Sequence, residues 1–388
     1  MQNEFNICSE VEKEKRNYIP MSPEIVQTTS FYFEKYEDFM SISEDEKNNF
    51  VYTRGSNPTT TVLEEKLAEL EHAEKCKVFA SGMGAISSTI FSLLKSDDHI
   101  LMINTIYGEA VSFVKDMERF NISSDRIDVE KTEDIVNHIK PNTKMIYFES
   151  PSTQKFQLLD LDKIKEISKK YGIYTVIDAT WASPLNQHPL DYGIDIVIHS
   201  LSKYVGGHSD VVGGCVLGSE KLVDIIFEKG HQSLGAVNSP FDSWLSLRGL
   251  RTLPVRMKYF NDSIQTVIDG IKTDHRINKI YHPYVGDEEQ QKLAAKYIKG
   301  YGSLFSFDLV DEDFEKLILF VNSLNTISIG VSWGGFESLV LPSYKGNNME
   351  KLKERGLSKT HIRMFVGLEN PDDLVEDIKQ ALTKAYGE

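Results

Sequence analysis

The chain contains 388 residues, of which 40% are hydrophobic and 26% are charged, as is ordinary for a soluble globular protein. This length exceeds what one hydrophobic core usually organises, so we expect one large domain and one smaller domain. The formal net charge is 43 − 58 = −15, and the acidic residues are spread along the chain. Such a balance argues against nucleic acid and against an anionic membrane surface as partners.

The cysteines and the N-terminal residues indicate a cytoplasmic protein. Cys8, Cys76 and Cys215 lie far apart without a CxxC spacing, so the sequence predicts neither a disulfide framework nor a zinc site. Reduced thiols are typical of the cytosol. The N-terminus lacks a cationic start followed by an apolar core, and no run approaches the roughly 18 apolar residues that span a membrane.

Residues 1–50 show no firm periodicity and include the polar stretch SISEDEKNNF. We expect an extended N-terminal arm that lies on the surface of this subunit or of a neighbouring one. In the segment from Thr60 to Glu74, by contrast, the apolar residues have helical spacing, which predicts the first long helix.

Short apolar runs then alternate with longer amphipathic stretches, of which 161–171 and 220–228 are examples. The candidate strands are KVFA, HILMIN, RIDVE, KMIYFES, YTVIDAT, DIVIHS and GGCVLG. This alternation predicts a mainly parallel sheet covered by helices on both faces, within a large α/β domain over residues 51–254.

The pattern of apolar and polar residues changes beyond residue 254. A smaller C-terminal α+β domain is expected over residues 255–388. Its predicted elements are a long helix over 255–272, the strands LFSFDLV and HIRMFVGL, and helices over 313–323 and 372–385.

Residues that could bind or react with a ligand follow several of the predicted strands. Ligands bind at this position in open parallel sheets. Ser81, Gly82 and Met83 follow KVFA and precede a helical run, so their backbone could hold a phosphate at a helix N-terminus, although a simple tight turn would also explain the glycine. Tyr107 follows HILMIN and could stack on a planar ring or pack its own loop.

Asp178 ends an apolar run, where a carboxylate is costly unless it is paired. Its partner could be a protonated pyridine nitrogen, or the residue could cap the following turn. Ser200 and Ser202 can donate hydrogen bonds to phosphate oxygens. Lys203 can condense with an aldehyde, and burial would lower its pKa. A lone lysine after a strand is usually solvated, but these companions favour a cofactor site.

Sequence motifs recur in a set order along nearly the whole chain. They are PEIVQTTSF, YTRGSNPTTTVLEEKLAELE, SGMGAI, IYG, YFESPS, VIDATWASP, HSLSKYVGGHSDVVGG, GAVNSPFDSWLSLRGLRTLPVRM, SWGGFESL and IRMFVGLE. In these motifs the chain resembles the pyridoxal-phosphate enzymes of cysteine and methionine metabolism. That group includes the cystathionine lyases, methionine γ-lyase, cystathionine γ-synthase and the homoserine-ester sulfhydrylases.

The resemblance implies pyridoxal 5'-phosphate (PLP) as cofactor and the aspartate-aminotransferase type of fold (fold type I). It also implies a homotetramer of two tight dimers, in which each active site takes residues from two subunits. Lys203 is similar to the Schiff-base lysine, Asp178 to the partner of the pyridine nitrogen, and Tyr107 to the catalytic tyrosine that stacks on the ring. The remaining cofactor contacts that the resemblance implies are Ser81, Gly82, Met83, Thr180, Ser200 and Ser202, with Tyr52 and Arg54 from the neighbouring subunit.

For the substrate, the resemblance implies that Arg363 anchors the α-carboxylate, with Ser332 nearby. Three further substrate positions depart from the common pattern of the family. Thr153 stands where asparagine is usual, Glu109 where methionine γ-lyases carry a reactive cysteine, and Val331 where the γ-synthases and cystathionine γ-lyases carry glutamate.

Val331, together with Trp181 and Trp333, favours a carbon–sulfur lyase, whereas Glu109 argues against a dedicated methionine lyase. Such a lyase performs α,β-elimination, or α,γ-elimination, on cystathionine, cysteine, homocysteine or methionine and releases thiol, ammonia and a 2-oxo acid. Trp181 and Trp333 are closer to the bacterial cystathionine β-lyases, whereas GAVNSPFD is typical of the γ-acting enzymes. The alternative is a γ-replacement transferase that joins an activated homoserine ester to cysteine or sulfide. A third hypothesis is a non-catalytic binding protein that kept the fold.

Overall fold

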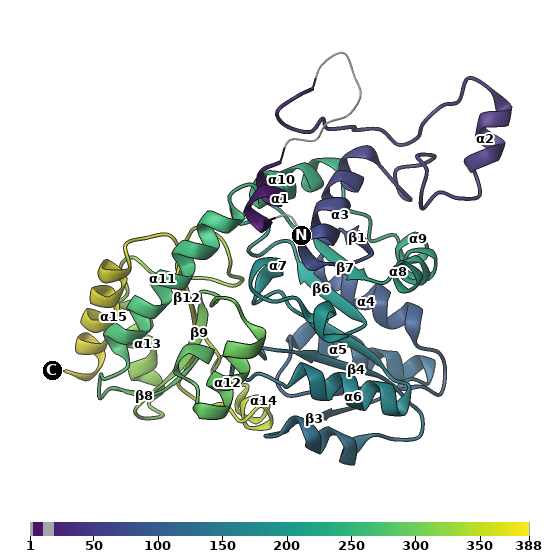
Figure 1. The fold of residues 1–388 in the computed structure, drawn as a ribbon. Helices are drawn as coiled ribbons and strands as arrows, with labels where there is room; N and C mark the ends of the chain where they lie inside the picture. The colour runs from purple at the N-terminus through teal and green to yellow at the C-terminus, as the bar shows by residue number, and fades with distance from the viewer. Residues whose placement is uncertain (1–2, 11–18, 388) are drawn as a thin grey trace.

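The computed structural model describes residues 3–10 and 19–387. It contains two β-sheets with helices packed around them (Figure 1). The strands of the larger sheet are β1 (Lys75–Phe79), β2 (His99–Ile103), β3 (Ser123–Ile127), β4 (Thr143–Glu149), β5 (Tyr174–Asp178), β6 (Ile196–Ser200) and β7 (Gly214–Gly218). Their spatial order is β1-β7-β6-β5-β4-β2-β3.

The larger sheet is mainly parallel, as predicted. Strand β7 runs antiparallel to both of its neighbours, and the other neighbouring strands pair in parallel. Every residue of β2 is buried, because helices cover both faces of the sheet. Continuous burial explains why the central strands are uninterrupted apolar runs in the sequence.

Alternate residues of each central strand pack into two different cores. Leu101 and Ile103 join the core formed with α3 (Pro58–Glu71) and α6 (Leu161–Tyr171). Ile100 and Met102 join the core on the opposite face, formed with α4 (Gly82–Leu93), α5 (Gly108–Asp116) and α8 (Glu220–Ile226). This period of two fixes the register of the sheet, since a shift of one residue would reverse every side chain.

The second sheet is formed from the C-terminal part of the chain. Its strands, β8 (Ile277–Tyr281), β9 (Leu304–Leu309), β10 (Ser328–Ile329), β11 (Leu339–Pro342) and β12 (His361–Phe365), lie in the order β10-β11-β12-β9-β8. A separate core joins it to α11 (Leu253–Ile271), α13 (Phe314–Asn322) and α15 (Pro371–Tyr386). The α/β sheet and this second, smaller sheet confirm the predicted fold class; the domain boundaries after residues 50 and 254 stay predictions.

The remaining helical segments are short or connect the two sheets. They are α7 (Ser183–Asn186), α9 (Gln232–Leu234), α10 (Pro240–Leu250), α12 (Glu288–Tyr297), α14 (Met349–Glu354), 3₁₀ turns at 117–120, 132–138, 189–192 and 283–285, and a π-helical turn, Phe227–His231. Of the helices in the described ranges, none has both the length and the apolar character needed to cross a bilayer.

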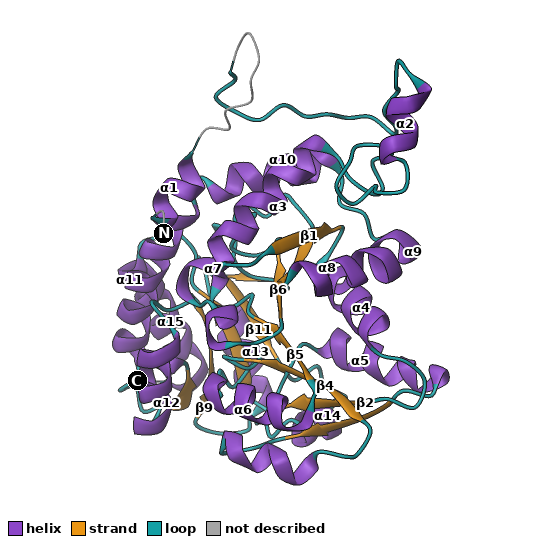
Figure 2. Ribbon diagram, turned by 45° about the vertical axis from the view of Figure 1, so that its right-hand side comes forward, coloured by secondary structure: helices purple, strands orange, loops and turns teal. Residues whose placement is uncertain are grey.

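The N-terminal arm contains two short helices that the sequence did not predict, α1 (Glu4–Ser9) and α2 (Tyr36–Ile42). Helix α1 buries Ile7 and Cys8 against the core, but six residues are too few to show a clear period. The views in Figures 1 and 2 agree that α2 projects away from the body of the molecule.

One predicted strand is displaced along the chain. RIDVE was expected at 126–130, whereas β3 covers 123–127 and includes polar Ser123 and Asp125. Strand β3 lies at the edge of the sheet, where one side faces solvent and apolar residues are not required. The apolar pattern therefore marked the wrong end of this strand.

Candidate active site

The candidate site lies where the parallel strands of the larger sheet end. Strands β4 and β5 are neighbours, and their last residues, Glu149 and Asp178, face each other in register. Strand β6 ends at Ser200, which is paired with Gly214 of β7. Because the carboxyl ends of parallel strands meet at one edge, residues far apart in the sequence converge here.

The turn between β1 and α4 lies directly against the end of β6. The hydroxyl oxygen of Ser81 caps α4 by accepting a hydrogen bond from the N–H of Gly84 at 2.9 Å. A Cβ atom added to Gly82 would lie 3.2 Å from the Cβ atom of Ser200. A Cβ atom on Gly214 would lie 2.4 Å from the carbonyl oxygen of Ser81. Glycine at these positions brings the N-terminus of α4 and the β6 residues close enough to share one ligand.

Thr180 and Ser202 support the end of β6 and the residue before β7 through hydrogen bonds to the backbone. The hydroxyl oxygen of Thr180 accepts the N–H of Ser200 at 2.8 Å. The hydroxyl oxygen of Ser202 accepts the N–H of Gly213 at 3.0 Å. Met83 begins the first turn of α4 and is partly buried. The residues predicted to surround a phosphate are therefore brought together.

Asp178 caps the turn that follows β5, which is one of the two alternatives that its sequence position left open. Its Oδ1 atom accepts hydrogen bonds from the N–H and the hydroxyl of Thr180, at 3.0 and 2.5 Å, so it caps the turn. Burial raises the pKa of this carboxyl, and the hydrogen bonds from Thr180 oppose that effect only in part. Asp178 forms no ion pair within the described residues, so a cationic ligand group would be a favourable neighbour.

Lys203 lies in the turn that follows β6, and its amine points toward the second sheet. Its Nζ atom donates a hydrogen bond to the hydroxyl of Ser332 at 2.8 Å and lies 5.6 Å from the centre of a Trp333 ring. Burial, together with the charge of Arg363, lowers the pKa of the amine to about 8. Such an amine is partly unprotonated near neutral pH.

The loop that carries Ser332 requires unusual backbone conformations. Ser332 has φ of +74° and Gly334 has φ of +91°. A Cβ atom on Gly334 would lie 2.8 Å from the carbonyl carbon of Lys203, so glycine permits the loop to contact the lysine turn directly.

Arg363 projects from β12 of the second sheet toward the same place. Its Nη2 atom donates to the carbonyl oxygen of Ser332 at 3.3 Å, and burial lowers its pKa to about 10. Within the part of the chain that the structure describes, no carboxylate forms an ion pair with this guanidinium. A partly buried guanidinium without an acidic partner is suited to a carboxylate ligand.

Tyr107 begins α5, with 47% of its surface exposed. Its N–H donates to Oε1 of Glu149 at 2.6 Å, and the Thr153 hydroxyl donates to the same carboxyl group. Burial and the charge of Asp178 raise the pKa of Glu149 to about 8. Sequence reasoning assigned Glu149 no role; its signal was an acidic residue ending the apolar run KMIYFE, in the strand before Asp178.

Four predicted site residues lie outside this inner cluster. Glu109 and Val331 are exposed, Val331 to 75%, although the charge of Glu109 contributes to a raised pKa of Tyr107. Tyr52 and Arg54 contact each other, with the guanidinium 5.4 Å from the ring centre. Among the described residues, neither of them contacts the Lys203 cluster of its own chain.

Comparison with known proteins identifies the class. The sequence profile of the Cys/Met metabolism PLP-dependent enzymes matches residues 6–383. L-methionine gamma-lyase of Fusobacterium nucleatum subsp. nucleatum is 34% identical over 377 residues, covering 95% of both chains. Cystathionine gamma-lyase of Bacillus subtilis is 36% identical over 338 residues, covering 86% of this chain and 88% of its own. The chain belongs to the Cys/Met metabolism PLP-dependent enzyme family, and PLP is its cofactor.

Solved structures agree with this assignment. O-acetylhomoserine (thiol)-lyase of Campylobacter jejuni, which carries a pyridoxyl-lysine monophosphate, superposes with a TM-score of 0.91 at 27% identity, covering 98% of this chain and all of its own. Cystathionine gamma synthase of Xanthomonas oryzae, solved with cystathionine, has a TM-score of 0.91 at 29% identity, covering 99% of each chain.

The residues present fit the cofactor. Asp178 offers a carboxylate that lacks a cation, Lys203 a partly unprotonated amine, and Gly82 a close approach between a helix N-terminus and Ser200. These features match the pyridine nitrogen, the aldehyde and the phosphate of PLP, respectively.

Proposed function

We propose that this protein is a PLP-dependent carbon–sulfur lyase that eliminates thiol from sulfur-containing amino acids. The observation that carries the proposal is the partly buried Arg363, which has no acidic partner among the described residues and lies beside Ser332, the hydrogen-bond partner of Lys203. A carboxylate bound by Arg363 would hold the α-carbon of an amino acid near the lysine. Similarity to the methionine and cystathionine lyases supports the choice of reaction.

Lys203 has two roles in this proposal. When PLP is bound, Lys203 would hold its aldehyde carbon, and as a free amine Lys203 would remove the α-proton of the substrate as general base. A pKa of about 8 suits this second role, because a useful fraction of the amine is unprotonated near neutral pH. When bound, PLP supplies an electron sink that stabilises the negative charge left on the α-carbon.

Tyr107 is proposed to stack on the ring and to take part in proton transfer. Burial and the neighbouring charge of Glu109 raise the pKa of its phenol, so its hydroxyl keeps its proton at neutral pH and can donate it. Expulsion of the sulfur from the β-carbon, with a proton to the departing thiolate, gives the thiol. One water molecule then hydrolyses the released unsaturated amino acid, as its imine, to ammonia and a 2-oxo acid. Elimination from the γ-carbon requires one further deprotonation, at the β-carbon.

The outer end of the substrate would meet Glu109, Thr153 and Val331. Val331 carries no charge and is 75% exposed, so it provides no carboxylate for the distal amine of cystathionine. This absence weighs against a cystathionine γ-synthase and against a cystathionine γ-lyase, whose members carry glutamate at the matching position.

A substrate panel tests the proposed reaction. Purified holoenzyme is incubated separately with cystathionine, cysteine, homocysteine and methionine, and 2-oxo acid, ammonia and thiol are measured. The proposal expects all three products from at least one substrate. Faster product formation from an O-acylhomoserine and a thiol would assign the chain to the transferases instead, and no turnover in either assay would favour a binding protein.

We also propose that the chain assembles as a homotetramer of two tight dimers, in which Tyr52 and Arg54 reach the cofactor phosphate of the neighbouring subunit. The support is the arm itself, which carries a series of exposed apolar side chains. They are Ile19, Met21, Ile25, Tyr32, Tyr36, Met40, Phe50 and Tyr52. Apolar side chains on a projecting segment are typical of an interface.

A further inference from the structure

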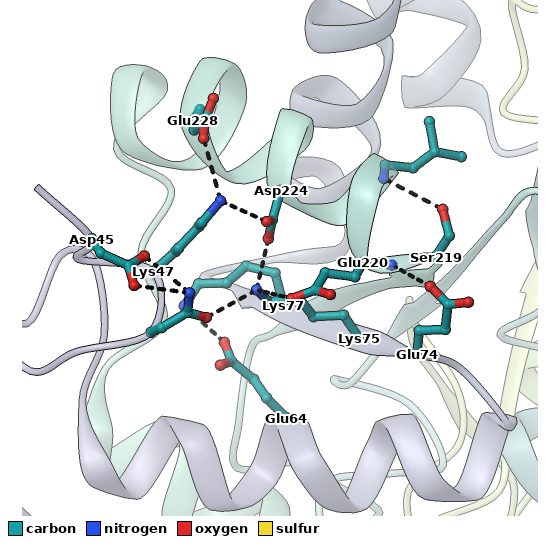
Figure 3. A network of polar contacts seen from close by, with 12 residues as sticks. Asp45, Lys47, Glu64, Glu74, Lys75, Lys77, Ser219, Glu220, Asp224 and Glu228 are labelled. Atoms are coloured by element: carbon teal, nitrogen blue, oxygen red, sulfur yellow. Dashed lines mark hydrogen bonds and ion pairs between the residues drawn. The ribbon is translucent and has the colours of Figure 1, made fainter.

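The segment that carries Tyr52 and Arg54 is fastened to its own subunit on both sides. Before it, Lys47 pairs with Asp224 of α8 at 2.7 Å (Figure 3). After it, the buried Lys77 of β1 donates to the carbonyl oxygen of Gly55 at 2.8 Å. Only a few residues separate the two attachments, so the conformational freedom of this part of the arm is small.

The ion pair at Lys47 belongs to a larger network. Asp224 also accepts from Lys75 of β1 at 2.7 Å, and the two lysine hydrogen bonds lower the pKa of this carboxyl despite its partial burial, which acts to raise it. In Figure 3 the carboxylate of Asp224 lies between the two ammonium groups. The side chain of Asp224 is only 16% exposed, and such shielding makes an ion pair stronger than a fully solvated one.

A second contact acts on Arg54 itself. The Nε atom of Arg54 donates to Oε1 of Gln232 at 2.9 Å, and Nε2 of Gln232 donates to Glu46 at 2.9 Å. The side-chain amide of Gln232 is therefore engaged at both atoms, its oxygen with Arg54 and its nitrogen with Glu46. We call Glu46, Lys47, Asp224 and Gln232 the arm clamp.

The clamp leaves the functional end of Arg54 available. Its terminal Nη1 and Nη2 atoms have no hydrogen-bond partner among the described residues, and the side chain is exposed. A guanidinium has five N–H donors, and Gln232 uses one of them. The four remaining donors can bind a phosphate in a bidentate contact.

We infer that Gln232 is a positioning residue, which orients Arg54 of one subunit toward the cofactor phosphate of the neighbouring subunit while Lys47 and Asp224 hold the arm. This inference rests on the proposed contact between Arg54 and that phosphate. It adds that the π-helical turn Phe227–His231 and Gln232, the residue after it, contribute to the active site of the neighbouring subunit, although they lie outside the active site of their own.

The test measures cofactor affinity in six variants. They are Gln232→Met, Lys47→Met, Arg54→Met, the double variants Gln232→Met/Arg54→Met and Lys47→Met/Arg54→Met, and the control Lys272→Met. Each holoenzyme is dialysed to equilibrium against decreasing PLP, and bound cofactor per subunit is determined. Lys272 forms an ion pair of 2.7 Å with Asp269, equal in length to that of Lys47, but on the exposed side of α11. Sedimentation at each PLP concentration gives the assembly mass.

We expect Arg54→Met to raise the PLP dissociation constant on the order of 50-fold, because a two-pronged charged contact is lost. Gln232→Met should raise it about fivefold to tenfold, and the double variant should equal Arg54→Met within about twofold, since Gln232 acts only through Arg54. Lys47→Met should weaken binding about threefold, again only while Arg54 is present. Lys272→Met should bind PLP normally.

The outcomes separate the inference from the proposal on which it rests. Unchanged affinity in Arg54→Met would overturn the phosphate contact and the inference with it. A loss in Arg54→Met without one in Gln232→Met, or an equal further loss in the double variant, would overturn the inference alone. A smaller assembly in Gln232→Met but not in Arg54→Met would also overturn it, because the clamp would then hold the interface.

Discussion

The amine of Lys203 lies in surroundings that disfavour its charged form. Burial and the nearby Arg363 lower its pKa to about 8, and Asp178 opposes them only in part. Because only the unprotonated amine attacks an aldehyde, cofactor-free protein should capture PLP faster as the pH rises, with a midpoint near 8 and a plateau above it. Stopped-flow absorbance across pH 6 to 10 measures this rate. A midpoint near the ordinary lysine value of about 10.4 would contradict the described environment of Lys203.

Arg363 is the residue whose replacement should separate substrate binding from cofactor binding. Arg363→Lys keeps the charge but removes the planar fork, so a bidentate carboxylate contact is lost. We expect kcat/KM to fall on the order of 10- to 100-fold, as the loss of charged hydrogen bonds of about 1.5–3 kcal/mol implies. The PLP content per subunit should remain unchanged. Steady-state kinetics with absorbance spectra check both expectations, and a loss of PLP instead would place Arg363 at the cofactor.

Asp377 of α15 shows how one side chain fixes the connection between two elements. Its carboxylate accepts the backbone N–H groups of residues 325–327 at 2.9–3.2 Å. Burial acts to raise its pKa, but these hydrogen bonds lower it overall. A folded pKa below the unfolded value contributes stability above about pH 3.9, which is lost as the pH falls through the folded pKa.

The expected effect of Asp377→Ala on the free energy of unfolding follows from the lowered pKa of the carboxyl. At pH 7 the variant should unfold with a free energy about 1–3 kcal/mol below the parent, because three backbone N–H donors, that of buried Ile327 among them, lose their charged acceptor. The difference should shrink as the pH is lowered below about 4. Urea unfolding across this pH range tests it, with Glu376→Ala, at an exposed position of the same helix, as control. An effect that does not depend on pH would mean that lost packing, not the carboxylate, is responsible.

The elements that the sequence predicted well are those whose pattern arises from burial on a regular surface. The helix at 161–171 matches α6 residue for residue, and α11, α13 and α15 agree within two residues of their predicted bounds, which is the usual uncertainty of helix ends. Strand β3 and helix α2 were missed or displaced because neither buries a continuous apolar face. Tertiary contacts, which a local pattern does not contain, fix such elements.

The same distinction applies to the candidate site. Lys203, Asp178 and Gly82 were singled out because each lies at or just after the end of an apolar strand, and the sheet brings such positions together. Glu149 and Gln232 were not assigned, because their roles depend on which residue lies across from them in space. A glutamine in a short helix has no local signal that it would contact Arg54, 178 positions earlier in the chain.

The proposed active site takes residues from two chains. At a PLP concentration that saturates the parent but not Arg54→Met, chains with Lys203→Ala or Arg54→Met should each be inactive or nearly so alone. In a mixed dimer, one site carries both changes and the other carries neither. After mixing and reassociation, activity should recover to about a quarter of the parent value, as random pairing within a twofold dimer predicts.

The mixing experiment has a direct control. A mixture of Lys203→Ala with Lys203→Ala/Arg54→Met contains no intact site in any combination, so it should show no recovery. No recovery in the test mixture despite confirmed exchange of chains would mean that Arg54 acts within its own subunit. Recovery in the control would mean that activity does not require Lys203. Sedimentation of the parent should give about four times the chain mass of 44.1 kDa, as expected of a tetramer.

The central claim is that Lys203 carries the cofactor, and chemical trapping tests it most directly. Borohydride reduction of the holoenzyme makes the bond between lysine and PLP permanent, and peptide mass spectrometry then locates the pyridoxyl group. We predict one modified lysine per chain, Lys203, and no modified peptide from the Lys203→Ala variant. A pyridoxyl group on any other lysine, or a holoenzyme in which reduction modifies none, would contradict the account.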